Sequence, residues 1–119
     1  MPVHNRDISK ILESMADLLD IGGDNPFRIR AYRNAARTIS TLSRPLSEMV
    51  EKGEDLTSIY GIGDDLAKKI ATIVSTGELP ALEKLEKQIP PSLLQLLNIP
   101  GLGPRRVGRI HELLGVTDL

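Results

Sequence analysis

The chain has 119 residues, of which 40% are hydrophobic, 26% charged and only 3% aromatic, with a net charge of −1. This balance is typical of one small globular domain or two very small ones, and it excludes a uniformly basic nucleic-acid binder. The absence of cysteine excludes a disulfide scaffold, and no apolar run approaches the roughly 20 residues that span a membrane. Without a secretory leader pattern at the N-terminus, a cytoplasmic monomer with no membrane partner is expected.

The charges are unevenly distributed along the chain. Residues 24–44 contain five arginines and one acid, and residues 101–111 contain three arginines and no acid. The acids concentrate in residues 7–24 and 48–65. The distribution therefore predicts local basic surfaces that the net charge does not reveal.

The apolar residues predict an all-α fold, because they recur at helical spacing and no stretch alternates with period two. Asn5 is expected to cap a first helix that ends at Gly22, and Asn25 with Pro26 to open a second. Short connections favour a compact bundle of short helices. Further helices or single turns are expected at residues 45–53, 56–59, 64–76, 79–87, 92–97 and 104–114, with Asp64 as an N-cap.

A repeated segment is the most informative feature of the sequence. Residues 58–70 read SIYGIGDDLAKKI and residues 98–110 read NIPGLGPRRVGRI, an offset of 40 residues. The glycine pair Gly61 and Gly63 recurs as Gly101 and Gly103. Such a repeat indicates one supersecondary unit that is used twice.

The two glycine turns are residues 59–63, the first hairpin, and residues 99–103, the second hairpin. Both turns have features that suit phosphate binding. Glycine accepts positive φ and lets another backbone come close. The helix that follows each turn begins with free N–H groups and the positive end of its dipole, which suits a phosphate. Phosphate contacts carry no base information, so binding would be independent of sequence. The alternative is a connection shaped only for packing.

These two segments resemble helix-hairpin-helix motifs, and NPFRIRAYRNAARTI (residues 25–39) resembles the region before them in bacterial and archaeal family X DNA polymerases, relatives of DNA polymerase beta. The resemblance implies an eight-kilodalton-like DNA-binding domain at residues 1–88 and the start of a fingers subdomain at residues 89–119. The catalytic palm, the only part expected to need a divalent metal, has no counterpart. The chain is therefore expected to be a fragment of a longer repair polymerase.

The resemblance also implies roles for individual residues. The partner would be gapped or 5′-phosphorylated duplex DNA, with the first hairpin on the downstream strand and the second on the primer or template side. Backbone carbonyls would hold Na⁺ or K⁺ at Thr57, Ile59 and Ile62, and at Leu97, Ile99 and Leu102. The DNA-binding residues would be Gly61, Ile62, Gly63, Lys68, Arg28, Arg30, Arg33, Arg37, Gly101, Leu102, Gly103, Arg105, Arg106 and Arg109.

Lys69 is the candidate for chemistry. It lies at the edge of the apolar face formed by Leu66, Ile70 and Ile73, where desolvation favours a lowered pKa and a Schiff-base nucleophile. Lys69 also matches the deoxyribose-phosphate lyase lysine of the family, and Tyr32 matches a tyrosine beside it. Asp64 and Asp65 oppose this role, because a nearby carboxylate favours the ammonium and repels an incoming anion.

Three hypotheses therefore remain: a DNA-binding module, a 5′-deoxyribose-phosphate lyase, and a helical protein-interaction domain. Arginines after the second hairpin favour stronger DNA binding there than at the first. Tyr60, which has Pro100 as its counterpart, either stacks on DNA or packs under the first hairpin. The apolar residues of the two hairpin helices are predicted to be buried: Leu66, Ile70, Ile73, Val107, Ile110 and Leu113.

Overall fold

The computed structural model of the chain describes residues 3–96, 100–101, 103–104 and 106–109, and all regular elements within them are helices. This confirms the predicted all-α fold. In chain order the elements are α1 (Asn5–Ile21), α2 (Pro26–Ser40), α3 (Leu46–Glu51), the 3₁₀ turn η1 (Leu56–Ser58), α4 (Asp64–Thr76), α5 (Pro80–Gln88) and α6 (Pro91–Leu96). Residues 104 and 106–109 are also helical.

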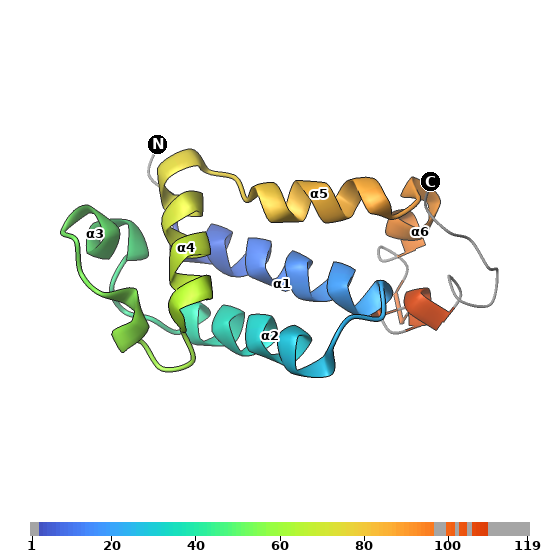
Figure 1. Ribbon diagram of the computed structural model, residues 1–119, viewed down its shortest axis with the longest axis horizontal. Coiled ribbons are helices and arrows are strands. Elements are labelled where there is room, and N and C mark those ends of the chain that lie inside the picture. The colour runs from blue at the N-terminus through green and yellow to red at the C-terminus, as the bar shows by residue number, and fades with distance from the viewer. Residues whose placement is uncertain (1–2, 97–99, 102, 105, 110–119) are drawn as a thin grey trace.

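Helix α1 forms the axis of the bundle (Figure 1). Helix α2 packs along one side of α1 and α5 along another, while α4 crosses α1 near one end and packs against α3. Helix α6 and residues 100–101, 103–104 and 106–109 lie at the opposite end. The first and second hairpins are therefore placed at the two ends of one elongated body.

The helix ends show how the sequence sets the elements. Asn25 accepts a hydrogen bond from the Phe27 N–H at 2.8 Å with Pro26 at the first helical position, as predicted. Asn5 is the first residue of α1 and not its N-cap, which is His4. The Asn5 side chain instead donates a hydrogen bond to the Arg44 carbonyl and accepts one from the Leu46 N–H, both at 2.8 Å. It thus ties the start of α1 to the start of α3.

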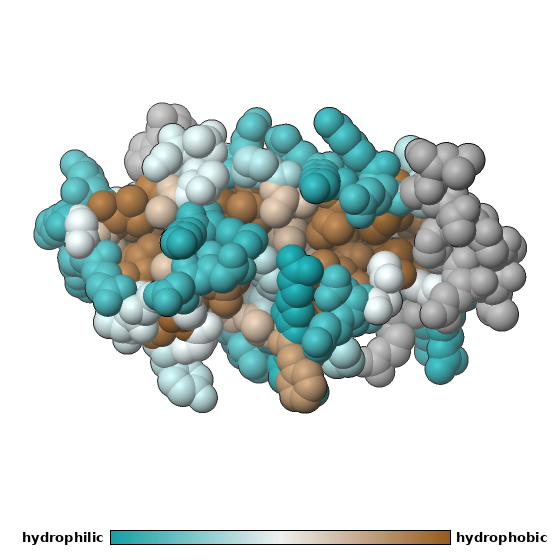
Figure 2. All heavy atoms as spheres, in the orientation of Figure 1, coloured by the Kyte–Doolittle hydropathy of each residue, from teal (hydrophilic) through white to brown (hydrophobic). Residues whose placement is uncertain are grey.

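Two apolar clusters hold the bundle together. The larger one joins α1, α2, α3 and α4, and it contains the predicted Leu66, Ile70 and Ile73. The smaller one joins Val107 to the end of α1, and its buried members are Leu18, Ile21, Ile89, Leu93 and Val107. The predicted Ile110 and Leu113 lie outside the described residues. Figure 2 shows apolar side chains along the middle of one face, flanked by polar ones.

None of the helices that the structure describes is long and apolar enough to cross a membrane.

Candidate functional site

The first hairpin is a tight turn anchored in the core. Gly61 has a φ of +83°, a region that side chains other than glycine rarely adopt. The Ile62 N–H donates to the Ile59 carbonyl at 3.1 Å, and the Ala67 N–H donates to the Gly63 carbonyl at 2.9 Å as α4 begins. The Ile62 side chain is buried. The expectation that Asp64 caps this helix is wrong, because Gly63 is the N-cap and Asp64 is the first helical residue.

The second hairpin repeats this geometry where the structure describes it. Gly101 also has a φ of +83°. The N–H groups of Arg106 and Val107 donate to the Gly103 carbonyl at 3.0 Å and 3.1 Å. Among the described residues, the two copies therefore share the φ of their first glycine and the hydrogen bond to the carbonyl of their second glycine. Leu97, Ile99, Leu102 and Arg105, to which the sequence assigned roles, lie outside the described residues.

Gly108 fixes the second hairpin against α1. A Cβ placed on Gly108 would meet the Ile21 carbonyl oxygen at 3.2 Å and the Asp20 carbonyl oxygen at 3.3 Å. Beside it, Val107 is fully buried. This close approach was missed at the sequence level, although a glycine inside a predicted helix is itself a signal of tight packing.

Basic side chains surround the second hairpin together with one acid. Arg106 donates to the Gly101 carbonyl at 3.1 Å, and both Arg106 and Arg109 are exposed. Asp20 lines the same shallow depression as Gly101, Arg106 and Arg109. Its presence was not predicted, because Asp20 and the second hairpin are about 80 residues apart in the sequence.

The arginines of α2 do not form one free basic surface. Arg33 contacts Asp17 at 2.9 Å, Asp20 at 3.3 Å and Glu13 at 3.8 Å. Burial alone would lower the pKa of Arg33, but these three carboxylates raise it above its usual value. Arg33 therefore binds α2 to α1 and neutralises the acid beside the second hairpin, which leaves its predicted contact with DNA without support.

The other three arginines of α2 differ in whether they have an interaction partner. Arg28 contacts Asp24 at 3.3 Å, and the Arg30 guanidinium lies 5.8 Å from the centre of the Phe27 ring. Arg37 is exposed, and none of the ion pairs among the described residues includes it. Of the predicted α2 cations, Arg30 and Arg37 thus remain accessible to an anion.

Carboxylates dominate the mouth of the first hairpin. Asp64 and Asp65 occupy the first turn of α4 and are exposed. Both carboxylate oxygens of Asp65 accept hydrogen bonds from the Lys69 ammonium at 2.8 Å. Lys68 is exposed on the other side of α4, as predicted.

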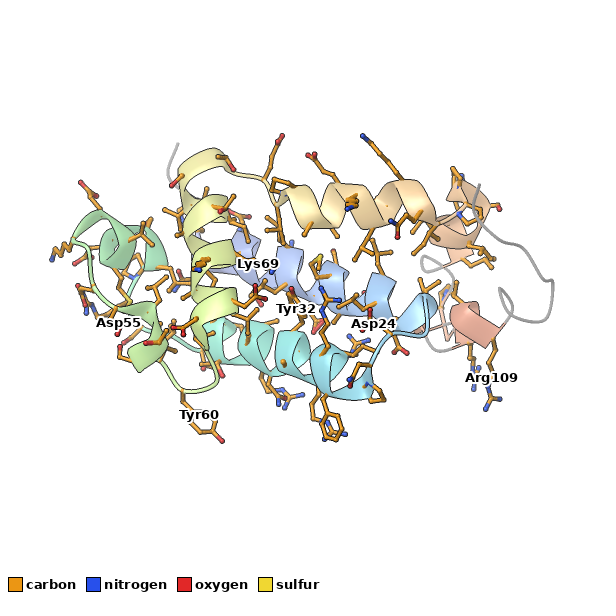
Figure 3. The ribbon with its side chains drawn as sticks, in the orientation of Figure 1. Asp24, Tyr32, Asp55, Tyr60, Lys69 and Arg109 are labelled. Atoms are coloured by element: carbon orange, nitrogen blue, oxygen red, sulfur yellow. The ribbon has the colours of Figure 1, made fainter. Side chains whose placement is uncertain are left out.

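Lys69 lies beside Tyr32 (Figure 3), as the resemblance implied, but the ionisation of Lys69 differs from the expectation. Its side chain is 19% exposed, and this burial alone would lower the pKa. The hydrogen bond to Asp65, the proximity of the Tyr32 phenol and the Asp65 charge outweigh burial, so the pKa of Lys69 is raised. The predicted lowered pKa is therefore wrong: the ammonium is the favoured form.

Tyr32 and Tyr60 have opposite surroundings. Tyr32 is 2% exposed, and its hydroxyl oxygen has no hydrogen-bond partner among the described residues. The Tyr60 side chain is 90% exposed and projects from the first hairpin into solvent (Figure 3). Packing of Tyr60 under the hairpin, one of the two alternatives from the sequence, is thereby contradicted.

The predicted cation ligands can be placed only at the first hairpin. The Ile59 carbonyl accepts the Ile62 N–H, and a carbonyl oxygen has a second lone pair that this bond leaves free. Thr57 and Ile59 are partly buried. The binding of a monovalent cation by these carbonyls remains a prediction.

Comparison with known proteins defines the class of this fold. Residues 3–79 match the helix-hairpin-helix domain family, and residues 53–115 match the SAM-like helix-hairpin-helix tandem family. The chain belongs to the helix-hairpin-helix domain family, and its tandem is the pair of hairpins described above.

Among characterised proteins, the chain is similar to DNA polymerases. It is 37% identical over 116 residues, 98% of its length, to the DNA polymerase/3′-5′ exonuclease PolX of Bacillus subtilis (strain 168). It is 28% identical over 103 residues, 86% of its length, to DNA polymerase lambda of Rattus norvegicus. It covers 20% and 17% of these relatives. The predicted resemblance to family X polymerases is confirmed, while the chain spans about a fifth of their length.

Proposed function

We propose that this chain binds the backbone of DNA without sequence preference, as the DNA-binding part of a family X DNA repair polymerase. One observation carries the proposal: two glycine turns with the same φ of +83° and the same first backbone hydrogen bond open two helices 40 residues apart. At the first hairpin, the N–H groups at the start of α4 lack intrahelical acceptors and lie at the positive end of the helix. The names of the two polymerase relatives support the same function.

The favoured substrate is duplex DNA with a gap and a 5′-phosphate at its downstream margin. The hairpins lie at opposite ends of an elongated molecule (Figure 1), so they suit two separated stretches of backbone better than one. A 5′-phosphate carries more negative charge than an internal phosphodiester and would compete better with Asp64 and Asp65 at the first hairpin. A Na⁺ or K⁺ on the hairpin carbonyls would offset part of that acidic charge.

Fluorescence anisotropy with labelled DNA tests the proposal. Gapped duplex with a 5′-phosphate should bind more tightly than the same DNA without the phosphate, and more tightly than blunt duplex. The logarithm of the binding constant should fall linearly with the logarithm of salt, by about 0.9 for each phosphate neutralised. Binding that is independent of salt would contradict the phosphate-binding role and would favour the hypothesis of a protein-interaction domain.

Deoxyribose-phosphate lyase activity is the second candidate function. The observation that favours it is the position of Lys69, largely buried beside the unpartnered Tyr32 hydroxyl. The Asp65 carboxylate opposes it, since it holds Lys69 as an ammonium. We propose that this activity is weak or absent in the unmodified chain, and borohydride trapping of an adduct between Lys69 and 5′-deoxyribose-phosphate DNA tests it.

A further inference from the structure

The exposure of Tyr60 is exceptional for this chain. The chain has only three aromatic residues, Phe27, Tyr32 and Tyr60. Tyr32 is buried in the core, and Phe27 already has the Arg30 guanidinium near its ring. Tyr60, at 90% exposure, is the most exposed large apolar side chain among the described residues. Packing in the core therefore does not explain why an aromatic side chain occupies this position.

The backbone on both sides of Tyr60 is fixed. On the preceding side, the Ile59 N–H donates to the Leu56 carbonyl at 3.1 Å. On the following side, the Ile62 N–H closes the turn back onto the Ile59 carbonyl, and Gly61 takes its positive φ. Ile62 itself is buried. The ring thus extends from a rigid turn, so little backbone freedom is lost when it makes a contact.

The position of Tyr60 relates it to the hairpin's ligand. It immediately precedes Gly61, the residue that shapes the proposed phosphate site, and its ring projects outward from that turn (Figure 3). The corresponding residue of the second hairpin is Pro100, which has no flat aromatic surface. A ring one residue from a bound phosphate is within reach of a base only if that base is unstacked, because bases inside a duplex are covered by their neighbours.

We propose that Tyr60 is a stacking site for an unpaired nucleobase, so that the first hairpin distinguishes single-stranded DNA at a gap from continuous duplex. This inference rests on the proposed function, because the hairpin must first hold the backbone. Aromatic side chains bind single strands in this way with little sequence preference, since every base has a flat π-face. The second hairpin, which lacks a ring, makes no such distinction.

Two substitutions at Tyr60 separate stacking from other roles. Tyr60→Leu keeps an apolar side chain and removes the ring, while Tyr60→Phe keeps the ring and removes the hydroxyl. Because the residue is almost fully exposed, neither change should disturb folding, which circular dichroism can check. Binding is measured on a duplex with a short single-stranded gap and on the continuous duplex of the same sequence.

Tyr60→Leu should weaken binding to the gapped DNA by about tenfold, in the lower half of the range of losses found when a stacked base loses its aromatic partner. Binding to continuous duplex should change less than about twofold, and Tyr60→Phe should behave like the unmodified protein. The fluorescence of 2-aminopurine placed in the gap should be quenched by the unmodified protein and by Tyr60→Phe, and not by Tyr60→Leu.

Other outcomes overturn the inference in recognisable ways. If Tyr60→Leu weakens binding to both DNAs equally, Tyr60 contacts the DNA backbone and not an unpaired base. If Tyr60→Leu binds gapped DNA as tightly as the unmodified protein does, the ring contacts no base. In both cases the proposed DNA binding survives. Failure of the unmodified protein to bind any of these DNAs would instead contradict the proposed function, and the stacking site with it.

Discussion

Gly61 and Gly101 have the same φ, but the helices that follow them begin with opposite charges. Asp64 and Asp65 open α4, whereas Arg106 and Arg109 follow the second hairpin. Near the second hairpin, the carboxylate of Asp20 is neutralised by its ion pair with Arg33. At the first hairpin, the ion pair with Asp65 neutralises the cation of Lys69. In the proposed function, the shared backbone geometry provides the anion site at each hairpin, and the neighbouring side chains set its strength.

The two hairpins also differ in what fixes them. The first is anchored by a buried side chain, Ile62, in the large cluster around α1 and α2. The second is fixed by Val107 and by the close approach of Gly108 to the end of α1. The first copy has Lys68 at the position of Gly108 and exposes it. At this pair of positions, one copy packs closely on the end of α1 and the other faces solvent.

Removing the cations of the second hairpin should have the largest effect on DNA binding. Arg106→Ala combined with Arg109→Ala should lower affinity for duplex DNA at low salt by roughly tenfold to a hundredfold, because two charge-assisted contacts are lost. The slope of the salt dependence should become shallower by about 0.9 for each lost phosphate contact, measured by anisotropy. The loss should be equal for unrelated sequences.

The matched control for this change is Lys84→Ala with Lys87→Ala, which removes two exposed cations from α5. If this control weakens binding as much as the arginine changes do, net charge and not the second hairpin determines affinity.

Filling the position of Gly108 should have the next largest effect. Gly108→Val should lower the free energy of unfolding by about 1–3 kcal/mol, because its Cβ would press on backbone atoms of Asp20 and Ile21 that cannot move aside easily. The same substitution at the equivalent position of the first copy, Lys68→Val, should change stability by no more than about 0.5 kcal/mol. Urea denaturation measures both. Equal effects at the two positions would contradict the different docking of the hairpins.

Neutralising the acids of the first hairpin should have a smaller effect of opposite sign. Asp64→Asn with Asp65→Asn should raise affinity for 5′-phosphorylated gapped DNA several-fold at low salt, since two charges that repel the incoming phosphate are removed. The gain should shrink as salt rises. Glu83→Gln with Glu86→Gln on α5 changes net charge equally and should leave affinity almost unchanged. A similar gain in this control would assign the effect to net charge alone.

The sequence predicted most of the fold because its signals were local. Asn25 with Pro26 set the start of α2, and Gly77, with a φ of +80°, ended α4 as expected. Periodicity also placed Lys68 in solvent and Lys69 at the edge of the core. Such features depend only on the 3.6-residue repeat and on local hydrogen bonds.

The parts that sequence could not predict depend on contacts between distant segments. The pairing of Arg33 with Asp17 and Asp20 requires the packing of α2 on α1, whereas the resemblance placed Arg33 with Arg30 and Arg37 among the DNA-binding residues. The pKa of Lys69 depends on a balance between burial and the Asp65 carboxylate, whose sign follows only from the distances. The roles assigned to individual residues in DNA binding stay predictions.

The smallest expected effect is the covalent trapping of DNA by Lys69. If Lys69 acts on a 5′-deoxyribose phosphate, its neutral amine adds to the C1′ aldehyde, water is lost, and borohydride reduces the imine to a stable adduct. The raised pKa leaves little neutral amine near neutral pH, so trapping by the unmodified chain should be faint or absent. Any adduct should increase as the pH rises towards the pKa of Lys69, and gel electrophoresis of the cross-linked DNA measures it.

Asp65→Asn should raise the yield of adduct and shift its pH dependence to lower pH, because the carboxylate that favours the ammonium is removed while burial remains. Lys69→Ala in that background should abolish the adduct, and Lys68→Ala should spare it, since Lys68 is exposed on the other side of α4. Asp64→Asn is the matched control, because Asp64 makes no ion pair with Lys69. Absence of any adduct in the Asp65→Asn protein, with DNA binding retained, would restrict Lys69 to binding phosphate. An adduct that persists in Lys69→Ala would move the chemistry to another amine of the chain.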